Sequence, residues 1–394
     1  MKVKIRDITD NLDYKRVPIS QKDRVNIEKR YPYYGAQGIV DYVDDYIFDG
    51  EYLLVAEDGE NLRSRKNSIV TFAKGKFWVN NHAHILGERE GADLAYIYYL
   101  LRVLDLSGYI TGSAQPKLTQ ENLGRIEVDI PDEKCQKAVA NLLSILDSKI
   151  DNNNAIAAEL EGMAKDLYDY WFVQFDFPDE NGKPYKSSGG KMVWNEELKR
   201  EIPEGWEVYQ LDELFRFVKG RIPTEVFDTN DGNNLIPYLT IEAVNAVPTS
   251  YCKKQGMITT AGDTIMVMDS AASSETYVGH YGALGSTFAK LEKVNGRVTD
   301  SFVYVIMQKY QSVFKKVNTG STVPHANKDY ISKFKVVLPQ DDCLKNMAIK
   351  FDTWVQKQIQ VREENAELTS LRDFLLPMLM NGQVLSLIHI SEPT

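Results

Sequence analysis

Cysteine, long apolar runs and excess positive charge are all scarce in this sequence. Only three cysteines occur among 394 residues, and none forms a Cys-x-x-Cys pair, which argues against structural zinc and favours a reducing compartment. No apolar run reaches the roughly 18 residues that a membrane helix needs, and the stretch from Met1 to Ile5 lacks the apolar centre of a signal peptide. We therefore expect a cytoplasmic protein with no membrane partner.

The net charge is −10, from 46 lysines and arginines against 56 aspartates and glutamates. This balance argues mildly against a nucleic-acid partner, although local patches govern binding more than the total charge does. Basic clusters occur at 15–16, 22–24, 29–30, 63–66 and 74–76. The cluster between Lys15 and Arg30 leaves two interpretations open, a binding patch or a solvated face.

Motifs of DNA-modifying catalysis are also missing. The chain has no glycine-rich S-adenosylmethionine loop after a strand, no Asn/Asp-Pro-Pro-aromatic motif and no Walker-type phosphate loop. His82 and His84 could bind a metal, but they have no third candidate ligand and are more simply structural. His280 and Asp269 do not form a triad with the nearby serines at any recognisable spacing. We therefore predict a protein with no catalytic residues and no metal site.

Two long stretches, residues 132–172 and 340–382, repeat apolar side chains every three or four positions. Such spacing is typical of the seam between two helices in a coiled coil. The predicted seam residues are Val139, Leu142, Leu146, Ile156, Leu160, Leu167, Met347, Trp354, Val361, Leu368 and Leu375. Four polar residues, Lys149, Asn153, Gln358 and Asn365, also fall on the seams. They either fix the helix register or lie at the edge of the seam in water.

The chain repeats itself after a shift of 208 positions. Gly112-Ser113 returns as Gly320-Ser321, Pro116 returns as Pro324, and residues 158–160 return as 366–368. A duplication of this length predicts two similar globules, each followed by a long helix. The expected segments are a first globule (1–131), a first long helix (132–172), a connector (173–204), a second globule (205–339) and a second long helix (340–382). Residues 385–394 resemble a translated cloning adapter and are expected to be foreign.

Two local features add narrower expectations. Asp49-Gly50 lies between two β-rich runs, which predicts the turn of a hairpin. Trp171, Phe172, Phe175 and Phe177 follow the first long helix. These aromatic side chains either dock a partner subunit or form a hydrophobic plug between the helix and a globule.

Several motifs together resemble the specificity subunit of type I restriction–modification systems. They are Tyr33–Ile39, Ile47–Leu53, Thr111–Leu118, Trp171–Pro178 and Ile202–Trp206. The order of these motifs, the duplication and the long helices match that family over about residues 1–384.

The resemblance implies an α+β fold with two target recognition domains and an antiparallel coiled coil that serves as a spacer. Each domain would read one half of a split sequence in double-stranded DNA. The subunit itself would be non-catalytic and bind no cofactor. Two modification subunits would methylate adenine with S-adenosylmethionine, and restriction subunits would use ATP and Mg to translocate and cleave DNA.

The duplicated loops carry the side chains that suit contact with bases and phosphates. The candidate residues are Gly112, Ser113, Gln115 and Lys117 in the first copy, and Gly320, Ser321, His325, Asn327 and Lys328 in the second. The same residues also suit an ordinary turn before a buried strand, so both interpretations stand. A second class of function also remains open, in which the globules form a scaffold that binds proteins and never DNA.

Overall fold

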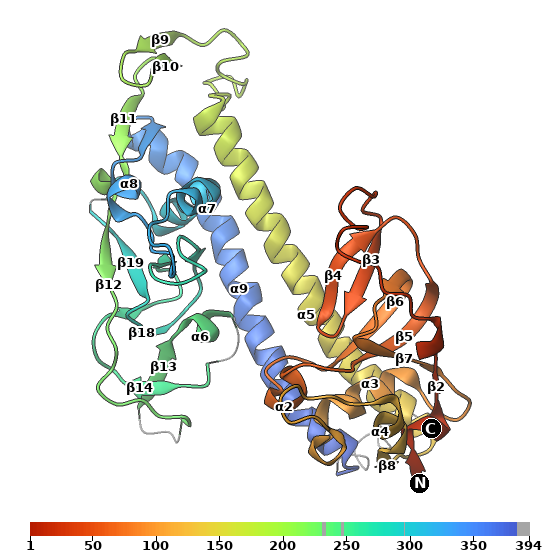
Figure 1. The fold of residues 1–394 in the computed structure, drawn as a ribbon. Helices are drawn as coiled ribbons and strands as arrows, with labels where there is room; N and C mark the ends of the chain where they lie inside the picture. The colour runs from red at the N-terminus through yellow and green to blue at the C-terminus, as the bar shows by residue number, and fades with distance from the viewer. Residues whose placement is uncertain (231–233, 246–247, 295, 384–394) are drawn as a thin grey trace, which may run out of the picture. The chain divides into compact units, whose positions relative to one another are not determined.

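The computed structural model describes residues 1–230, 234–245, 248–294 and 296–383 (Figure 1). The chain divides into two compact units. Unit 1 is Met1–Lys149 with Leu371–Thr394, and unit 2 is Ile150–Ser370. The tail that resembles an adapter, residues 385–394, lies outside the described residues.

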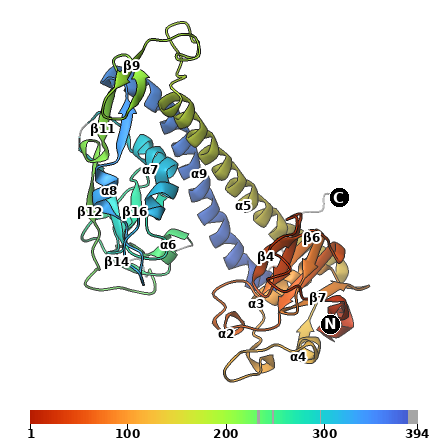
Figure 2. The ribbon, with the colours of Figure 1, turned by 45° about the horizontal axis from the view of Figure 1, so that its top comes forward.

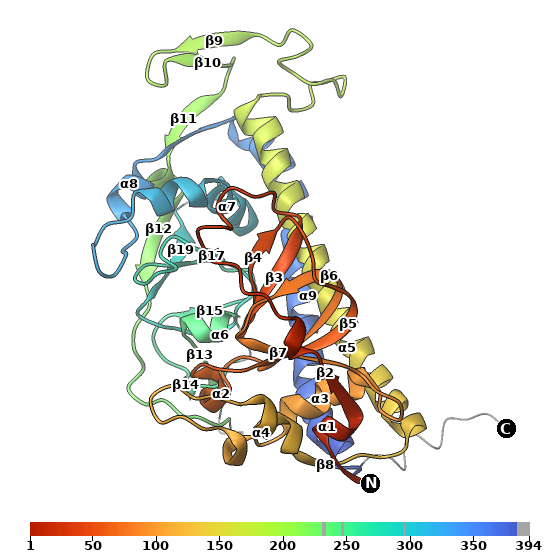
Figure 3. The same ribbon diagram turned by 45° about the vertical axis from the view of Figure 1, so that its right-hand side comes forward.

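Unit 1 is built on a six-stranded sheet in the order β2-β7-β5-β6-β3-β4, antiparallel except for the parallel pair β3 and β6. Its strands are β2 (Thr9–Asn11), β3 (Tyr31–Gly35), β4 (Gly38–Val43), β5 (Phe48–Ala56), β6 (Val70–Val79) and β7 (Ala83–Glu88). A separate ladder pairs β1 (Lys2–Lys4) with β8 (Glu127–Asp129). The helices are α1 (Ile5–Ile8), α2 (Asn61–Ser64), α3 (Leu94–Val103) and α4 (Gln120–Arg125), with short turns η1 (Asp13–Lys15) and η2 (Ser107–Tyr109). Helices α1 and α4 lie side by side (Figure 3).

The predicted hairpin turn at Asp49-Gly50 is wrong. Both residues lie inside the continuous strand β5, where Asp49 pairs with Lys76 and Gly50 pairs with Gly75 of β6. Gly50 adopts a φ of +144°, a backbone conformation that glycine reaches at low cost. The Asp-Gly pair therefore allows an irregular backbone within a strand and does not end one.

Unit 2 carries the same kind of sheet in two pieces, with strand orders β12-β19-β16-β17 and β14-β13-β18-β15. The strands are β12 (Phe215–Lys219), β13 (Leu235–Leu239), β14 (Tyr251–Lys253), β15 (Ile258–Thr259), β16 (Ile265–Val267), β17 (Thr276–Tyr277), β18 (Gly282–Leu284) and β19 (Phe288–Lys293). Two further ladders pair β9 (Met192–Asn195) with β10 (Arg200–Pro203), and β11 (Glu207–Gln210) with β20 (Lys335–Leu338). The helices are α6 (Ile241–Asn245), α7 (Asp300–Lys316) and α8 (Lys328–Ser332), with a short turn η4 (Leu211–Glu213).

The two units repeat each other down to single hydrogen bonds. The amide of Ile5 donates to the carbonyl of Ile126 in unit 1, and the amide of Leu211 donates to Phe334 in unit 2. Each of these segments opens with a backbone amide bonded to a carboxylate three residues later. The parallel pair β3 and β6 of unit 1 also returns as β13 and β18 in unit 2. The duplication in the sequence is therefore a duplication of fold.

Two long helices, α5 (Glu133–Tyr168) and α9 (Asp341–Met380), run antiparallel (Figure 2). Their 36 and 40 residues give lengths of about 54 and 60 Å. Helix α5 continues as a π-helical turn, η3 (Asp169–Val173). In unit 1, Arg372 bonds Asp147 at 2.8 Å, and in unit 2, Gln358 donates to the carbonyl of Ala157. Asp147 on α5 pairs with Arg372 on α9, and Ala157 pairs with Gln358. Residue numbers therefore increase along α5 as those of the partners on α9 decrease, as expected for antiparallel helices.

The burial of the helices differs in part from the predicted seam. Leu142 is 38% exposed, whereas its neighbour Leu143 is fully buried. Val139, Met347 and Val361 are buried, and the other predicted apolar seam residues are half-buried. The face of each helix that is buried also packs on a globule, so its pattern is broader than that of a two-helix seam. Sequence spacing alone could not separate Leu142 from Leu143.

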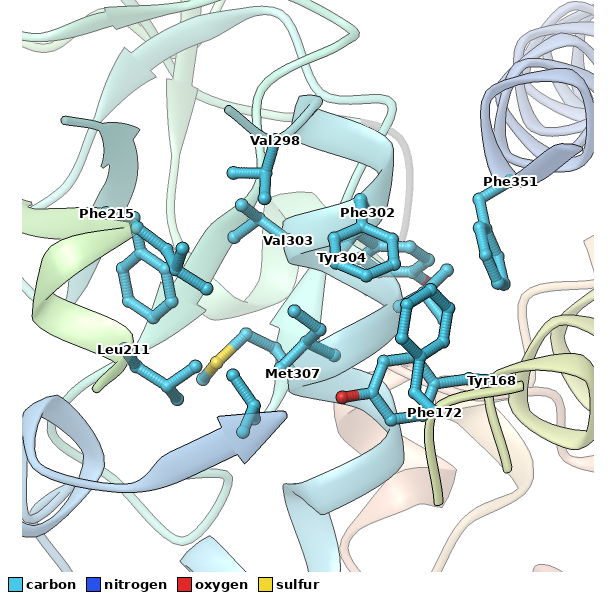
Figure 4. Close-up of a cluster of buried hydrophobic side chains, with 14 of the residues drawn as sticks. Tyr168, Phe172, Leu211, Phe215, Val298, Phe302, Val303, Tyr304, Met307 and Phe351 are labelled. Atoms are coloured by element: carbon cyan, nitrogen blue, oxygen red, sulfur yellow. The ribbon is translucent and has the colours of Figure 1, made fainter. Parts of the chain in front are cut away.

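The aromatic residues after α5 form a plug in the core of unit 2. Phe172, Phe175 and Phe177 are buried, and Trp171 is half-buried against Phe351. Figure 4 shows Phe172 facing Phe302 of α7, and the two ring centres are 5.1 Å apart. Of the two interpretations left open by the sequence, the structure supports the hydrophobic plug.

Candidate nucleic-acid interface

The first candidate loop, residues 111–117, is closed by a pair of backbone hydrogen bonds. The amide of Thr111 donates to Lys117 at 2.8 Å, and the amide of Lys117 donates back at 2.7 Å. Gly112 has a φ of +84°, and a Cβ there would lie 2.1 Å from the carbonyl oxygen of Gln115. Only glycine fits this position without moving the backbone. Ser113 and Gln115 are exposed at the tip of the loop.

The base of this loop is fixed to the sheet of unit 1. The amide of Gly59 donates to the carbonyl of Pro116 at 3.1 Å, and the amide of Leu118 donates to the carbonyl of Glu57 at 2.8 Å. The Lys117 ammonium lies 3.1 Å from the Glu57 carboxylate. Gln115 therefore projects from a loop whose arm after the tip is fixed by backbone hydrogen bonds.

A network of hydrogen bonds among charged and polar side chains packs against the base of the loop. The Arg16 guanidinium bonds Glu57 at 2.6 Å, and the buried His84 ring contacts Asp13 on one side and the carbonyl of Leu118 on the other. Burial would raise the pKa of Glu57, but hydrogen bonds from Arg16 and Lys117 bring it below its usual value. The interpretation of His84 as structural agrees with these contacts.

The second candidate loop, residues 319–325, has the same closure. The amides of Thr319 and His325 donate to each other's carbonyls at 2.9 and 2.7 Å. Gly320 has a φ of +87°, and a Cβ there would lie 2.3 Å from the carbonyl oxygen of Val323. Ser321 is exposed, and Val323 stands where the first loop has Gln115. The two loops share a backbone conformation and differ in the side chains at their tips.

His325 occupies the position of Lys117 and also bonds a carboxylate. Its Nδ1 lies 2.8 Å from Asp269, whose other oxygen lies 3.1 Å from the ammonium of Lys219. Burial alone would raise the pKa of Asp269, but the bonds from His325 and Lys219 lower it. The His325 side chain remains half exposed, so one face of the ring can still meet a ligand.

Asn327 and Lys328 have different roles from the tip residues. The side chain of Asn327 accepts a bond from the amide of Tyr330 and so caps the N-terminus of α8. Its amide group donates to the carbonyl of Val317 at 3.4 Å. Lys328 is exposed, with its ammonium 5.6 Å from the Phe217 ring centre. Asn327 therefore stabilises the start of α8, whereas the side chain of Lys328 is exposed at the surface.

Several cations of the basic clusters in unit 1 are paired with carboxylates. Arg24 and Lys29 share Asp41, and Lys74 bonds Glu51. Arg30 bonds Glu28. For the stretch between Lys15 and Arg30, these pairs favour a solvated face of the protein over an open phosphate-binding patch.

The sequence did not reveal the residues that hold the loops. In unit 1, Arg63 donates to the carbonyls of Gly112 and Ser113 from a turn about 50 residues earlier. In unit 2, the fully buried Ser273 donates to the carbonyl of Pro324 at 2.7 Å. No local pattern links either residue to its loop.

Two features are absent from the part of the chain that the structure describes. No described helix is both long and apolar enough to cross a membrane. Within the same residues, no group of three His, Cys, Asp or Glu side chains is arranged to hold a metal ion.

Comparison with known proteins places the chain in a family. The family described as "Type I restriction modification DNA specificity domain" matches residues 1–162 and 203–369. These two matched regions fit two recognition domains, as the duplication predicts.

Individual relatives agree with this match. A specificity subunit of Methanocaldococcus jannaschii, named type I restriction enzyme MjaIX, is 24% identical over 338 residues, which is 80% of this chain and 74% of the relative. A Haemophilus influenzae protein named as a type I specificity subunit is 32% identical over 140 residues, but the match spans only 36% of this chain and 35% of that protein.

A crystal structure of a type I system S subunit from M. genitalium has the same fold. It aligns with 96% of this chain and 95% of its own length, at a TM-score of 0.59 and 19% identity. The family match covers well over half of the residues, so the chain belongs to the family of type I restriction–modification DNA specificity proteins.

Proposed function

We propose that this chain reads a split DNA sequence for a type I restriction–modification complex, with one recognition domain for each half. The observation that carries the proposal is the duplicated loop. The same closed frame occurs in both units, but it presents Gln115 and Lys117 in one and Val323 and His325 in the other. Two loops with the same backbone closure but different side chains suit the recognition of two different half-sites.

Gln115 at the tip of the first loop, and Lys117 and His325 at the closing pair of each loop, have the chemistry that base reading requires. Gln donates and accepts in a geometry that matches adenine, and lysine or a histidine ring N–H can donate to the acceptors of guanine. Each of these side chains stands on a backbone fixed by hydrogen bonds to the segment that follows β5 or β16. A fixed backbone limits the number of bases that a side chain can reach, which favours specificity.

The proposal extends to partners and location. Two modification subunits would bind the chain and methylate adenine with S-adenosylmethionine, and restriction subunits would supply cleavage with ATP and Mg. The chain would work in the cytoplasm. The absence of catalytic motifs from the sequence is consistent with a subunit that supplies recognition alone.

A protein-binding scaffold is the second candidate function. Two observations favour it, the net charge of −10 and the pairing of Arg24, Lys29 and Lys74 with carboxylates. A scaffold of this kind would show no affinity for duplex DNA that depends on sequence.

The deciding experiment maps methylated adenine in cells that express this chain with its modification subunit. A parallel culture lacks only this chain. We expect a split motif that appears only when the chain is present. Purified complex should also lose affinity for duplex DNA steeply as salt rises, because phosphate contacts release counterions. If the modification subunit works with another specificity subunit but gives no new motif here, the scaffold reading is the better one.

A further inference from the structure

Arg63 of unit 1 forms hydrogen bonds that hold one arm of the first loop in place. Its guanidinium donates to two neighbouring carbonyls, those of Gly112 and Ser113, with the Ser113 bond at 3.3 Å. These carbonyls lie on the arm of the loop that leads to the tip. The other arm is held by the bond from Gly59 to Pro116. Arg63 therefore secures the side that the sheet leaves free.

The arginine comes from a rigid support. Helix α2 is anchored by Asn61, whose side chain donates to the carbonyl of Asn67 at 3.0 Å and accepts from the amide of the same residue at 2.9 Å. Arg65 ends the helix and bonds the carbonyl of Leu104 at 2.6 Å. A planar guanidinium on a fixed turn can hold two acceptors in one geometry.

Unit 2 has a side-chain contact on the other arm of its loop, the arm that follows the tip, where the amide of Ser270 also donates to the carbonyl of Pro324. Ser273 is fully buried beneath the second loop and donates to the carbonyl of Pro324 at 2.7 Å. Its oxygen also accepts a bond from the amide of Ser270. One loop is thus held from outside by an exposed arginine, and the other from inside by a buried serine.

We infer that Arg63 is a positioning residue for the first half-site, because it sets the loop that presents Gln115 to DNA. This inference rests on the proposed reading of DNA. A flexible tip could meet more than one base, so loss of the clamp would relax specificity more than it would reduce affinity. Ser273 holds the carbonyl of Pro324, next to His325, and on that contact we assign it to the second half-site.

An exposed arginine could instead contact a DNA phosphate directly, and salt dependence separates the two roles. A phosphate contact contributes equally to all sequences and adds about one unit to the salt slope. A clamp on the protein backbone leaves the slope unchanged and alters the preference among bases.

The test uses the full chain in complex with its modification subunit. Methylated-adenine mapping and binding to duplexes with single base changes would be compared for wild type, Arg63→Ala and Arg63→Lys. For both variants we expect about a tenfold loss of discrimination in one half-site, a sharp second half-site and a wild-type salt slope. Lysine should not rescue, because a single ammonium does not reproduce the planar fork.

Matched controls come from the same chain. Lys66→Ala removes an exposed cation of the same turn and should leave both half-sites sharp. Ser273→Ala should relax the half-site that Arg63→Ala leaves intact. Thermal unfolding of each variant confirms that the fold is kept.

Three outcomes would overturn the inference. They are an unchanged first half-site in Arg63→Ala, a uniform affinity loss with a shallower salt slope, or full rescue by Arg63→Lys. Failure of the proposed function itself would look different, because the wild-type complex would then give no split motif at all.

Discussion

A buried carboxyl group in unit 1 and a buried histidine in unit 2 affect stability in acid in different ways. In unit 1, burial would raise the pKa of Asp13, but its hydrogen bond and charge interaction with His84 lower it on balance. That contribution is lost only as the pH falls below the usual range of a carboxyl group. In unit 2, burial and then the charge of Arg362 lower the pKa of His280 from 6.5 to about 4. The free energy of unfolding of unit 2 therefore begins to fall at a higher pH, because the unfolded His280 is protonated before the folded one.

We expect His280→Gln to reduce the acid sensitivity of unit 2. Between about pH 6.5 and 4 the unfolded histidine binds a proton that the folded one does not accept, so stability falls as the pH falls. Between pH 7.5 and 5 this amounts to about 2 kcal/mol. Four of the five tryptophans, at positions 171, 194, 206 and 354, lie in unit 2, so their fluorescence during urea unfolding follows this unit.

The comparison needs an exposed histidine as its control. His82 of unit 1 is half exposed and bonds Asp58, so His82→Gln should leave the acid response of the tryptophan signal unchanged. An identical loss of stability at pH 5 in His280→Gln and wild type would show that His280 is not the group responsible.

Helices α5 and α9 are joined by a polar layer as well as by apolar contacts. Asn153 is only 1% exposed, and its amide group lies 2.8 Å from Glu364 and 2.9 Å from the side-chain oxygen of Asn365. Asn365 in turn donates to Asn154 and to the carbonyl of Ile150. For Asn153, Gln358 and Asn365 the contacts support the interpretation in which polar seam residues fix the register of the two helices within unit 2, whereas Lys149 is exposed.

We predict that Asn153→Ala lowers the stability of unit 2 by about 1–2 kcal/mol, because it removes two hydrogen bonds from a buried side chain to part-buried acceptors on α9. Its neighbour Asn152 is exposed, so Asn152→Ala should change stability by less than about 0.5 kcal/mol. Urea unfolding followed by tryptophan fluorescence measures both. Equal effects of the two substitutions would indicate that the polar layer contributes nothing specific.

The duplication gives the chain two separate loops, one in each unit, for the same proposed role in DNA recognition. Each unit closes its own loop, and all the bonds that hold a loop come from the same unit. No described contact requires the first loop to change when the second one does. Specificity at one half-site should therefore vary without effect on the other.

We expect Gln115→Ala to alter the base preference in one half-site and His325→Ala to alter it in the other. Each replacement removes a hydrogen-bonding side chain worth about 1–3 kcal/mol of discrimination against a wrong base. Methylated-adenine mapping of the two variants shows which half of the motif becomes degenerate. Weakening of both halves by either change would contradict the modular arrangement.

The sequence by itself determined the features that repeat or that follow a local period. The shift that relates Gly112 to Gly320 revealed the two globules, and the three-to-four spacing revealed the two long helices. A turn was one of the two interpretations of the loops at these glycines, and the positive φ of each glycine agrees with it. Backbone sterics and helix geometry act over a few residues, so their signals stay readable in the chain.

Only the tertiary structure decided which residues those elements bring together. It buried Leu143 in place of Leu142, set Asp49-Gly50 inside a strand and turned Asn327 into a helix cap. It also placed Arg63 on a loop about 50 residues away and Ser273 beneath another at a similar separation. Such contacts depend on how separate elements pack, and packing energies are shared among residues that have no fixed spacing in the chain.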